Sequence, residues 1–284
     1  MQANSHNTLI SAKALMALTH SHTNVLVLDV SFDLTDTQAG ERSHAQGHVP
    51  GAIYVHLERD LSSAKTGQNG RHPLPTRTAF AATIGGLGIQ PGVQVVALDR
   101  QGGIYAARLW WMLRWLGHTE VAVLDGGVPA WQAAGGAMSA DAVVATAAST
   151  YPERPSLTTT VSADDLLKRL GKTPLIDARA AERFRGDAEP LDIQTGHIPG
   201  ARNRFYKENL DAAGRFKSAA LLHQDFTALG ASQSPSDVVH QCGSGVTACH
   251  NVLAMEVAGL SGSVLYPGSW SEWSSDPSKP IARG

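Results

Sequence analysis

The chain has 284 residues, enough for about two domains, and its 23 Lys and Arg residues against 25 Asp and Glu residues give a formal net charge of −2. Hydrophobic residues make up 43% and charged residues 17% of the sequence, which excludes a disordered or collagen-like chain. The near-neutral charge offers no basic surface for a phosphate backbone, so we expect no nucleic acid partner.

Two further features predict the compartment. The first eleven residues contain no basic stretch followed by an apolar one, and no run of eighteen apolar residues occurs, so we expect neither a signal peptide nor a membrane partner. Only two cysteines occur, Cys242 and Cys249, too few for a disulfide framework. We therefore expect a soluble, cytoplasmic protein, and we take it to be a monomer.

Four landmarks occur twice in the same order along the chain, which indicates an internal repeat. An apolar run ending in an acid, at residues 25–31, is followed by GHVPGA; the same pair returns as PLIDAR and GHIPGA. Asp29 and Asp177 lie 148 positions apart, and Gly47 and Gly196 lie 149 apart. The pairs VQVVALD and SDVVHQC, and GGVPAW and GSWSEW, follow at offsets of 143 and 142.

The repeat sets the expected domain organisation. Short β-branched runs such as VQVVAL alternate with amphipathic segments such as residues 76–89 and 219–231, a pattern typical of a parallel sheet with helices on both sides. Residues 135–155 are rich in Ala, Ser, Gly and Thr, as expected of a linker that packs little. We predict an α/β fold with an N-terminal domain over 1–138, a linker over 139–156 and a C-terminal domain over 157–284.

The most reactive residue stands at a strand end in the second copy. Cys242 follows the apolar run VVHQ and precedes a loop with two glycines and a predicted helix over 248–255. Ligands of parallel sheets bind beyond the carboxyl ends of the strands, where loop N–H groups and the positive end of a helix face the ligand. This setting favours a nucleophilic thiolate at Cys242. Because the loop itself contains no Lys or Arg, we expect backbone dipoles to supply most of the stabilisation.

The motifs GHVPGA, GRHPLP, AARLWWMLRWLGH, DGGVPAW, ERFRG, GHIPGA, CGSGVTA and YPGSWSEW together resemble two tandem rhodanese-like domains, over nearly the whole chain. Rhodanese-like sulfurtransferases take sulfur from thiosulfate or 3-mercaptopyruvate onto a cysteine of the C-terminal copy. The resemblance implies that Cys242 is this cysteine. Asp99 occupies the matching place in the first copy and cannot accept sulfur, so the N-terminal domain is expected to be catalytically silent.

The resemblance also implies roles for other residues. Gly243, Gly245, Val246 and Thr247 would complete the loop that binds the substrate. Ser244 would work with an acid and a histidine of the first copy, which match Glu58, with Asp60 as a neighbouring alternative, and His72. Arg183 in ERFRG would hold the carboxylate of the substrate, since a planar fork suits a carboxylate.

The donor stays open between two compounds. The neutral CGSGVT loop resembles that of 3-mercaptopyruvate sulfurtransferases, whereas thiosulfate enzymes tend to carry basic residues after the cysteine. However, a second arginine usual in the mercaptopyruvate enzymes is absent, because Asp192 stands at that place. Arg185 is the residue that could compensate. We favour 3-mercaptopyruvate as the donor and keep thiosulfate as the alternative.

The implied reaction needs no cofactor and no metal. The partners would be a small sulfur donor and a thiol acceptor, such as thioredoxin or a small thiol, with cyanide as an acceptor in the test tube. A phosphatase reaction is disfavoured because Thr247 stands where such loops need an arginine. A non-catalytic sulfur carrier or interaction module is the more distant alternative.

Three residues invite a structural interpretation instead. Asp29 and Asp177 recur in both copies, so we expect each to brace its own domain by accepting backbone N–H bonds after a strand. Cys249 lies two helical turns beyond the loop, where a packed core residue is the default.

Overall fold

The computed structural model describes residues 5–21, 24–143, 148–231 and 234–284. These residues form two compact units. Unit 1 comprises Met1–Ser62, Pro75–Leu157 and Ala213–Arg215, and unit 2 comprises Ser63–Leu74, Thr158–Ala212 and Phe216–Gly284. A short piece of the N-terminal half of the sequence, Ser63–Leu74, therefore belongs to unit 2, a point that matters for the site.

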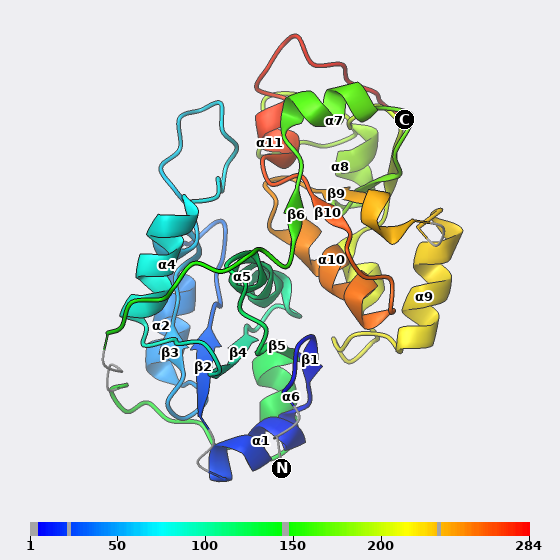
Figure 1. Ribbon diagram of the computed structural model, residues 1–284. Coiled ribbons are helices and arrows are strands. Elements are labelled where there is room, and N and C mark those ends of the chain that lie inside the picture. Colours follow the sequence, from blue (N-terminus) through cyan, green and yellow to red (C-terminus); the bar gives the residue numbers. More distant parts are fainter. Residues whose placement is uncertain (1–4, 22–23, 144–147, 232–233) are drawn as a thin grey trace. The chain divides into compact units, whose positions relative to one another are not determined.

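Unit 1 is built on a five-stranded sheet in the order β1-β5-β4-β2-β3, and all its strand pairs are parallel. The strands are β1 (Leu9–Ile10), β2 (Val25–Asp29), β3 (Ile53–Tyr54), β4 (Gln94–Leu98) and β5 (Val121–Leu124). The helices are α1 (Ala12–His20), α2 (Ala39–Gln46), α3 (Leu57–Asp60), α4 (Arg77–Gly86), α5 (Ile104–Trp115) and α6 (Gly127–Ala133). Within this unit α1 and α6 lie beside β1 (Figure 1).

Unit 2 repeats this plan with the order β6-β10-β9-β7-β8, again all parallel. Its strands are β6 (Thr159–Thr160), β7 (Leu175–Asp177), β8 (Ala201–Asn203), β9 (Val239–Gln241) and β10 (Val264–Leu265). Its helices are α7 (Ala163–Arg169), α8 (Ala181–Arg185), α9 (Ala219–Ala228), α10 (Thr247–Val257) and α11 (Ser269–Trp273), with short 3₁₀ turns at Tyr206–Asn209 and Pro235–Asp237. The predicted parallel α/β fold in two copies is confirmed.

The same local signals start corresponding helices in the two units. The Ser11 hydroxyl accepts a hydrogen bond from the Ala14 N–H at the start of α1, and Ser162 does the same for Asp165 in α7. Thr76 and Ser218 cap α4 and α9 in this way. Such caps satisfy N–H groups that the first helical turn leaves without a partner.

Each unit has its own apolar core, in which a pair of helices packs on one face of the sheet. In unit 1, α1 and α6 contribute Leu15 and Trp131, which pack against β-strand residues such as Val96. In unit 2, α7 and α11 contribute Leu166 and Trp270 to the equivalent cluster. Because side chains alternate along a strand, the opposite face of each sheet remains for other helices, and α5 packs there on β4 and β5.

The predicted linker makes close contacts with unit 1 at a few residues. Residues 144–147 lie outside the described residues, but the segment that follows joins unit 1. The Ser149 N–H donates to the Gly85 carbonyl at 2.8 Å, and the buried Tyr151 hydroxyl lies 2.9 Å from His118 Nδ1. Most of the described residues of 135–155 are exposed, as expected of a segment that packs little, and the close contacts above are those of Ser149 and Tyr151.

The structure also locates the structural residues. Asp29 and Asp177 each accept the backbone N–H two positions on, from Ser31 and Arg179, both at 2.9 Å. Cys249 is fully buried in α10, and neither cysteine forms a disulfide. None of the described helices combines the length and apolar character needed to cross a bilayer.

Candidate functional site

The loop from Cys242 to Val246 joins β9 to α10 at the carboxyl edge of the sheet in unit 2. Cys242 is 1% exposed and Ser244 is 7% exposed. The first turn of α11 fixes the loop backbone: the N–H groups of Trp270 and Ser271 donate to the carbonyls of Cys242 and Gly243 at 2.9 and 2.8 Å. These two bonds fix the backbone of the loop that carries the thiol.

Ser269 holds the cysteine from the other side. Its hydroxyl accepts the Cys242 N–H at 3.1 Å and donates to the Tyr266 carbonyl at 2.9 Å. Among the described residues, Ser269 alone has a positive φ without being glycine, at 55°. Such a conformation costs about 1 kcal/mol or more, and strain of this kind often marks a functional position.

Gly245 is needed for the turn of the loop. Its φ is 74°, and a Cβ atom there would lie 2.2 Å from the Pro267 carbonyl oxygen. A side chain at this position would thus be strained in conformation and blocked by backbone. Val246 is the buried residue that precedes α10, and Thr247 is the first residue of that helix.

The corresponding loop of unit 1 shows what such a backbone can bind. The Asp99 carboxylate, 143 positions before Cys242, accepts four backbone N–H bonds of 2.8 to 3.0 Å. The donors are Gln101, Gly103, Tyr105 and Ala106. Burial raises the pKa of Asp99, and these four hydrogen bonds act in the opposite direction by stabilising the carboxylate. The loop of this fold therefore forms a cradle of amides around an acidic group, and Cys242 occupies the same place in unit 2.

Ser244 is hydrogen-bonded to a histidine of the Ser63–Leu74 segment. The His72 Nδ1 atom lies 2.8 Å from the Ser244 hydroxyl oxygen, and both side chains are buried. The segment is closed by the Ser63 N–H, which donates to the Pro73 carbonyl, and anchored to α11 by the Arg71 N–H, which donates to the Ser271 hydroxyl. The predicted pairing of Ser244 with His72 is thus present as a contact within unit 2.

The acid predicted to join them belongs to unit 1. Glu58 is on the short helix α3, and its N–H donates to His56 Nδ1 at 3.2 Å. The neighbouring candidate, Asp60, accepts the His56 N–H at 2.7 Å and pairs with Arg59 at 3.5 Å. The role of Glu58 stays a prediction.

Two basic side chains lie beside the loop, in addition to the backbone dipoles that were expected to supply most of the stabilisation. A Cβ atom on Gly243 would lie 2.9 Å from the guanidinium of Arg71 and 3.4 Å from that of Arg183. Both arginines form ion pairs with Asp192, and Arg183 also pairs with Glu189 at 2.7 Å. The loop sequence itself is neutral, but tertiary packing brings cations from two distant segments to it.

A third arginine of this cluster is buried. Arg179 is 3% exposed, pairs with Asp177 at 2.7 Å and Glu189 at 3.3 Å, and lies over the Trp270 ring at 4.7 Å. Burial lowers the pKa of Arg179, but the charges of Asp177, Glu189 and Cys242 outweigh this effect and raise it. Arg179 is therefore a buried structural member of the cluster, whereas Arg71 and Arg183 remain partly exposed.

Sequence reasoning missed four members of this cluster, Arg71, Arg179, Glu189 and Asp192, as site residues. Arg71 stands next to His72 in GRHPLP and Arg179 follows Asp177, so both had a neighbour in a recognised motif. Burial raises the pKa of Asp192, while the charges of Arg71 and Arg183 act in the opposite direction. Arg185, expected to compensate for the acid at this place, instead pairs with Asp187 at the surface.

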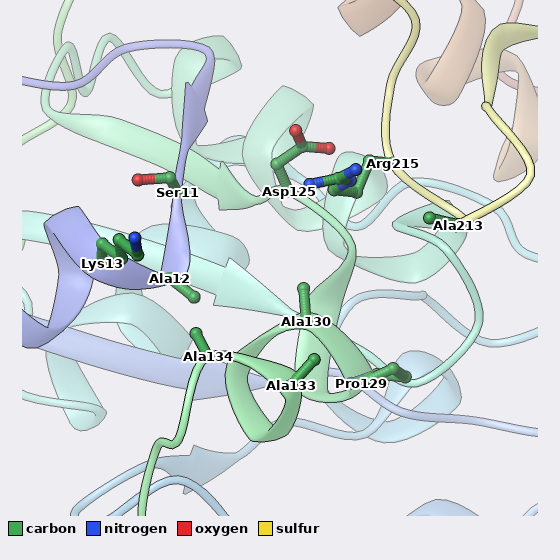
Figure 2. Close-up of a pocket in the computed structure, with 10 residues that line it drawn as sticks. All are labelled: Ser11, Ala12, Lys13, Asp125, Pro129, Ala130, Ala133, Ala134, Ala213 and Arg215. Carbon is green, nitrogen blue, oxygen red and sulfur yellow. The ribbon is translucent and has the colours of Figure 1, made fainter.

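A separate cavity of about 590 Å³ lies in unit 1, and Figure 2 shows that it is bordered by the alanines of α6 on one side and by Asp125 and Arg215 on another. None of the predicted site residues lines it. Within the described ranges, no group of His, Cys, Asp or Glu side chains is arranged to hold a metal ion.

The chain is similar to known proteins over nearly its whole length. A protein of Pseudomonas aeruginosa named "Probable 3-mercaptopyruvate sulfurtransferase" is 42% identical over 280 residues, 97% of this chain and 98% of that protein. A thiosulfate sulfurtransferase of Gallus gallus is 33% identical over 253 residues, 87% of this chain and 85% of that protein. The structure of 3-mercaptopyruvate sulfurtransferase from Leishmania major superposes with a TM-score of 0.84 at 28% identity, covering 96% of this chain and 76% of that one.

The repeat seen in the sequence and in the sheet order corresponds to a known domain. The profile of the Rhodanese-like domain matches residues 11–134 and again residues 162–276. The two matches together cover more than half of the chain, and each contains four of the five strands of one parallel sheet. The predicted resemblance is confirmed: the chain belongs to the rhodanese family, with two rhodanese-like domains in tandem.

Proposed function

We propose that this protein is a sulfurtransferase in which Cys242 accepts a sulfur atom from 3-mercaptopyruvate and passes it to a thiol. The observation that carries the proposal is the paired loops: four amides bind the Asp99 carboxylate in unit 1, and Cys242 stands at the same place in unit 2. A persulfide anion on Cys242 would meet an equivalent cradle.

The first half-reaction transfers the sulfur. The Cys242 thiolate attacks the sulfur of 3-mercaptopyruvate, an S–S bond forms, and the C–S bond breaks with its electron pair on the carbon, which gives the enolate of pyruvate. The enolate takes up a proton and leaves as pyruvate, while the new persulfide loses its S–H proton. The contact between Ser244 and His72, at 2.8 Å, offers a path along which this proton can move.

The second half-reaction regenerates the enzyme. The thiolate of an acceptor attacks the outer sulfur of the persulfide, and the S–S bond breaks with its electron pair on Cys242. Cyanide would give thiocyanate in the same way. Thioredoxin or a small thiol as acceptor, a cytoplasmic location and a monomeric state belong to this proposal; the two free cysteines suit the reducing compartment in which such thiols are found.

The two units differ in role under this proposal. A carboxylate cannot accept a sulfane sulfur, so the N-terminal domain is silent and supports the C-terminal one. The domain boundaries proposed from the sequence, 1–138 and 157–284, then separate a structural copy from a catalytic copy. Ser63–Leu74 is the exception, because it contributes His72 to unit 2.

Thiosulfate is the second candidate donor, favoured by a specific observation. Arg71 and Arg183 both approach Gly243, and basic groups next to the cysteine suit a sulfonate leaving group. The ratio of kcat/KM for the two donors separates the candidates. A preference of tenfold or more for thiosulfate would overturn the choice of 3-mercaptopyruvate.

Intact-mass spectrometry tests the proposal directly. After incubation with 3-mercaptopyruvate and no acceptor, we expect the wild-type protein to gain one sulfur atom and Cys242→Ser to gain none. Cys249→Ser is the matched control, because this second buried thiol should be dispensable for sulfur uptake. Turnover of Cys242→Ser should fall at least about 1,000-fold. Full activity of this variant would place the reaction elsewhere.

A further inference from the structure

Two arginines from different parts of the sequence face the residue next to the reactive cysteine. Arg71 comes from the Ser63–Leu74 segment and Arg183 from α8, yet a Cβ atom on Gly243 would meet both guanidinium groups, at 2.9 and 3.4 Å. The absence of a side chain at Gly243 is what leaves room for them. The space beside Cys242 is therefore bordered by cations.

Asp192 holds the two arginines in a fixed relation. One of its carboxylate oxygens is paired with Nη1 of Arg71, and the other lies 3.0 Å from Nη2 of Arg183. The carboxylate is itself only 4% exposed. A buried acid that bridges two guanidinium groups fixes their separation, so the pair is preorganised before any donor arrives.

The backbone beside Arg71 is fixed to the same loop. Its N–H donates to the Ser271 hydroxyl at 2.9 Å, and the Ser271 N–H donates to the Gly243 carbonyl at 2.8 Å. The next residue along the chain is His72, in contact with Ser244. One short segment thus positions a cation and a histidine on the same loop.

The guanidinium of Arg71 has an edge available for a ligand. Its Nη1 atom donates to Asp192 and to the Leu191 carbonyl, whereas Nη2 is the atom nearest Gly243. The buried Nε has no hydrogen-bond partner among the described residues. The side chains of Arg71 and Arg183 are 19% and 18% exposed, against 1% for Arg179. An incoming anion can therefore reach the first two arginines and not the third.

We infer that Arg71 is a substrate-binding residue that determines donor specificity, acting with Arg183 as a two-guanidinium clamp for the anionic group of the sulfur donor. The ligand class is a small molecule whose transferable sulfur lies close to a carboxylate or sulfonate. Asp192 is the positioning residue that spaces the clamp. This inference rests on the proposed function, because it assumes that Cys242 accepts sulfur from such a donor.

Steady-state kinetics of Arg71→Gln and Arg71→Lys test the inference. Gln removes the charge and the fork, so we expect KM for 3-mercaptopyruvate to rise at least tenfold with kcat within threefold, and thiosulfate to be affected in the same direction. Lys keeps the charge without the fork and should recover only part of the loss. Arg185→Gln, which removes an equal charge from the same unit, is the matched control and should leave KM within twofold.

A readout of the acceptor step separates binding from mere structural support. Persulfide-loaded protein should transfer its sulfur to the neutral thiol 2-mercaptoethanol at the same rate in Arg71→Gln and in the wild type, because no donor anion is bound in that step. A distorted loop would slow both half-reactions and would refute a binding role. If Arg71→Gln does not fold, an unchanged KM in Arg71→Lys equally refutes the inference.

Failure of the inference differs from failure of the proposed function. If the wild-type protein takes up no sulfur on Cys242 from either donor, the proposed function is wrong. If the wild type takes up sulfur and Arg71→Gln keeps its KM within twofold, the function stands and the role of Arg71 is wrong. A rise in KM on Arg185→Gln matching that of Arg71→Gln would also overturn the inference, since the effect would then be one of net charge.

Discussion

The two loops that follow β4 and β9 share a backbone plan and differ in the group at its centre. In unit 1 the carboxylate of Asp99 permanently occupies the amide cradle and satisfies four N–H donors. In unit 2 the equivalent place holds the thiol of Cys242. The same arrangement thus stabilises the fold in one unit and, under our proposal, binds an intermediate in the other.

The last two residues of the strands that lead into these loops differ in polarity between the units. Ala97 and Leu98 precede Asp99, whereas the buried His240 and Gln241 precede Cys242. The Nδ1 atom of His240 and both amide atoms of Gln241 have no hydrogen-bond partner among the described residues. Buried polar groups without partners cost stability. Unit 2 therefore has buried polar groups without described partners in the strand before its reactive loop. The matching residues of unit 1, Ala97 and Leu98, are apolar.

The largest effect is expected when the cysteine is moved from the loop of unit 2 to that of unit 1. We expect Asp99→Cys combined with Cys242→Ser to remain at least about 1,000-fold below the wild type in sulfur transfer, because the amide cradle alone does not bind a donor. The arginine that follows, Arg100, is committed to Asp29 at 2.7 Å. Intact mass after donor incubation gives the measurement. Sulfur uptake at position 99 would show that the cradle suffices without the arginines of unit 2.

Replacing Asp99 tests whether its side-chain hydrogen bonds stabilise unit 1. Asp99→Ala leaves four buried N–H groups without their acceptor, so the free energy of unfolding should fall by about 3–6 kcal/mol, allowing for partial rescue by water. Asp99→Asn should cost less, about 2–3 kcal/mol, because one oxygen still accepts two bonds while the amide nitrogen meets two donors. Chemical denaturation at pH 7 measures both. Equal losses for the two variants would contradict this account.

The buried histidine of β9, His240, predicts that the stability of unit 2 depends on pH. Burial lowers the pKa of His240 to about 3 from an ordinary 6.5, so the unfolded chain binds a proton that the folded unit refuses. The stability is complete above about pH 6.5 and is lost as the pH falls toward 3. Between pH 7 and 4.5 this group alone should cost about 2–3 kcal/mol.

The variant His240→Val sharpens that measurement, since Val suits a buried strand and cannot be protonated. Denaturation of the wild type and the variant at pH 7 and at pH 4.5 gives the difference directly. We expect the wild type to lose about 2–3 kcal/mol more than the variant over this interval. An identical acid loss in both proteins would assign the effect to other groups.

The smallest expected effect concerns the residue that clamps the loop. Ser269, at φ 55°, corresponds to Gly127, at φ 57°, where a Cβ atom would lie 2.1 Å from the Asp99 carbonyl oxygen. Ser269→Gly removes the hydroxyl acceptor of the Cys242 N–H but relieves the strain, so its net cost should be below about 1 kcal/mol. Ser269→Ala keeps the strain and should cost about 1–2 kcal/mol. Thermal unfolding of both variants makes the test, and a larger loss for Gly than for Ala would refute it.

Much of the molecule was predictable from local patterns. The repeated apolar runs ending in an acid coincide with β2 and β7, and the runs VQVVAL and SDVVHQ coincide with β4 and β9. The strand, cysteine, glycine and helix sequence around Cys242 placed the loop at the edge of the sheet. These features depend on neighbours in the chain, which is why one sequence reveals them.

Other features escaped prediction because they depend on distant contacts. The neutral loop gave no sign that Arg71 and Arg183 would approach Gly243, since one comes from 172 positions before it and the other from 60. The contacts of Ser149 with Gly85 and of Tyr151 with His118 were likewise hidden, because their partners lie far away in the sequence.

The sequence by itself determined that there are two parallel α/β copies, where each strand meets its loop, and that only the second loop carries a thiol. Only the tertiary structure decided that the Ser63–Leu74 segment packs with unit 2, that His72 lies 2.8 Å from Ser244, and that Asp192 joins two arginines beside the thiol. The physical reason is that strand and helix formation follow from local periodicity and capping, whereas the charge around a site is the sum of groups that folding brings together.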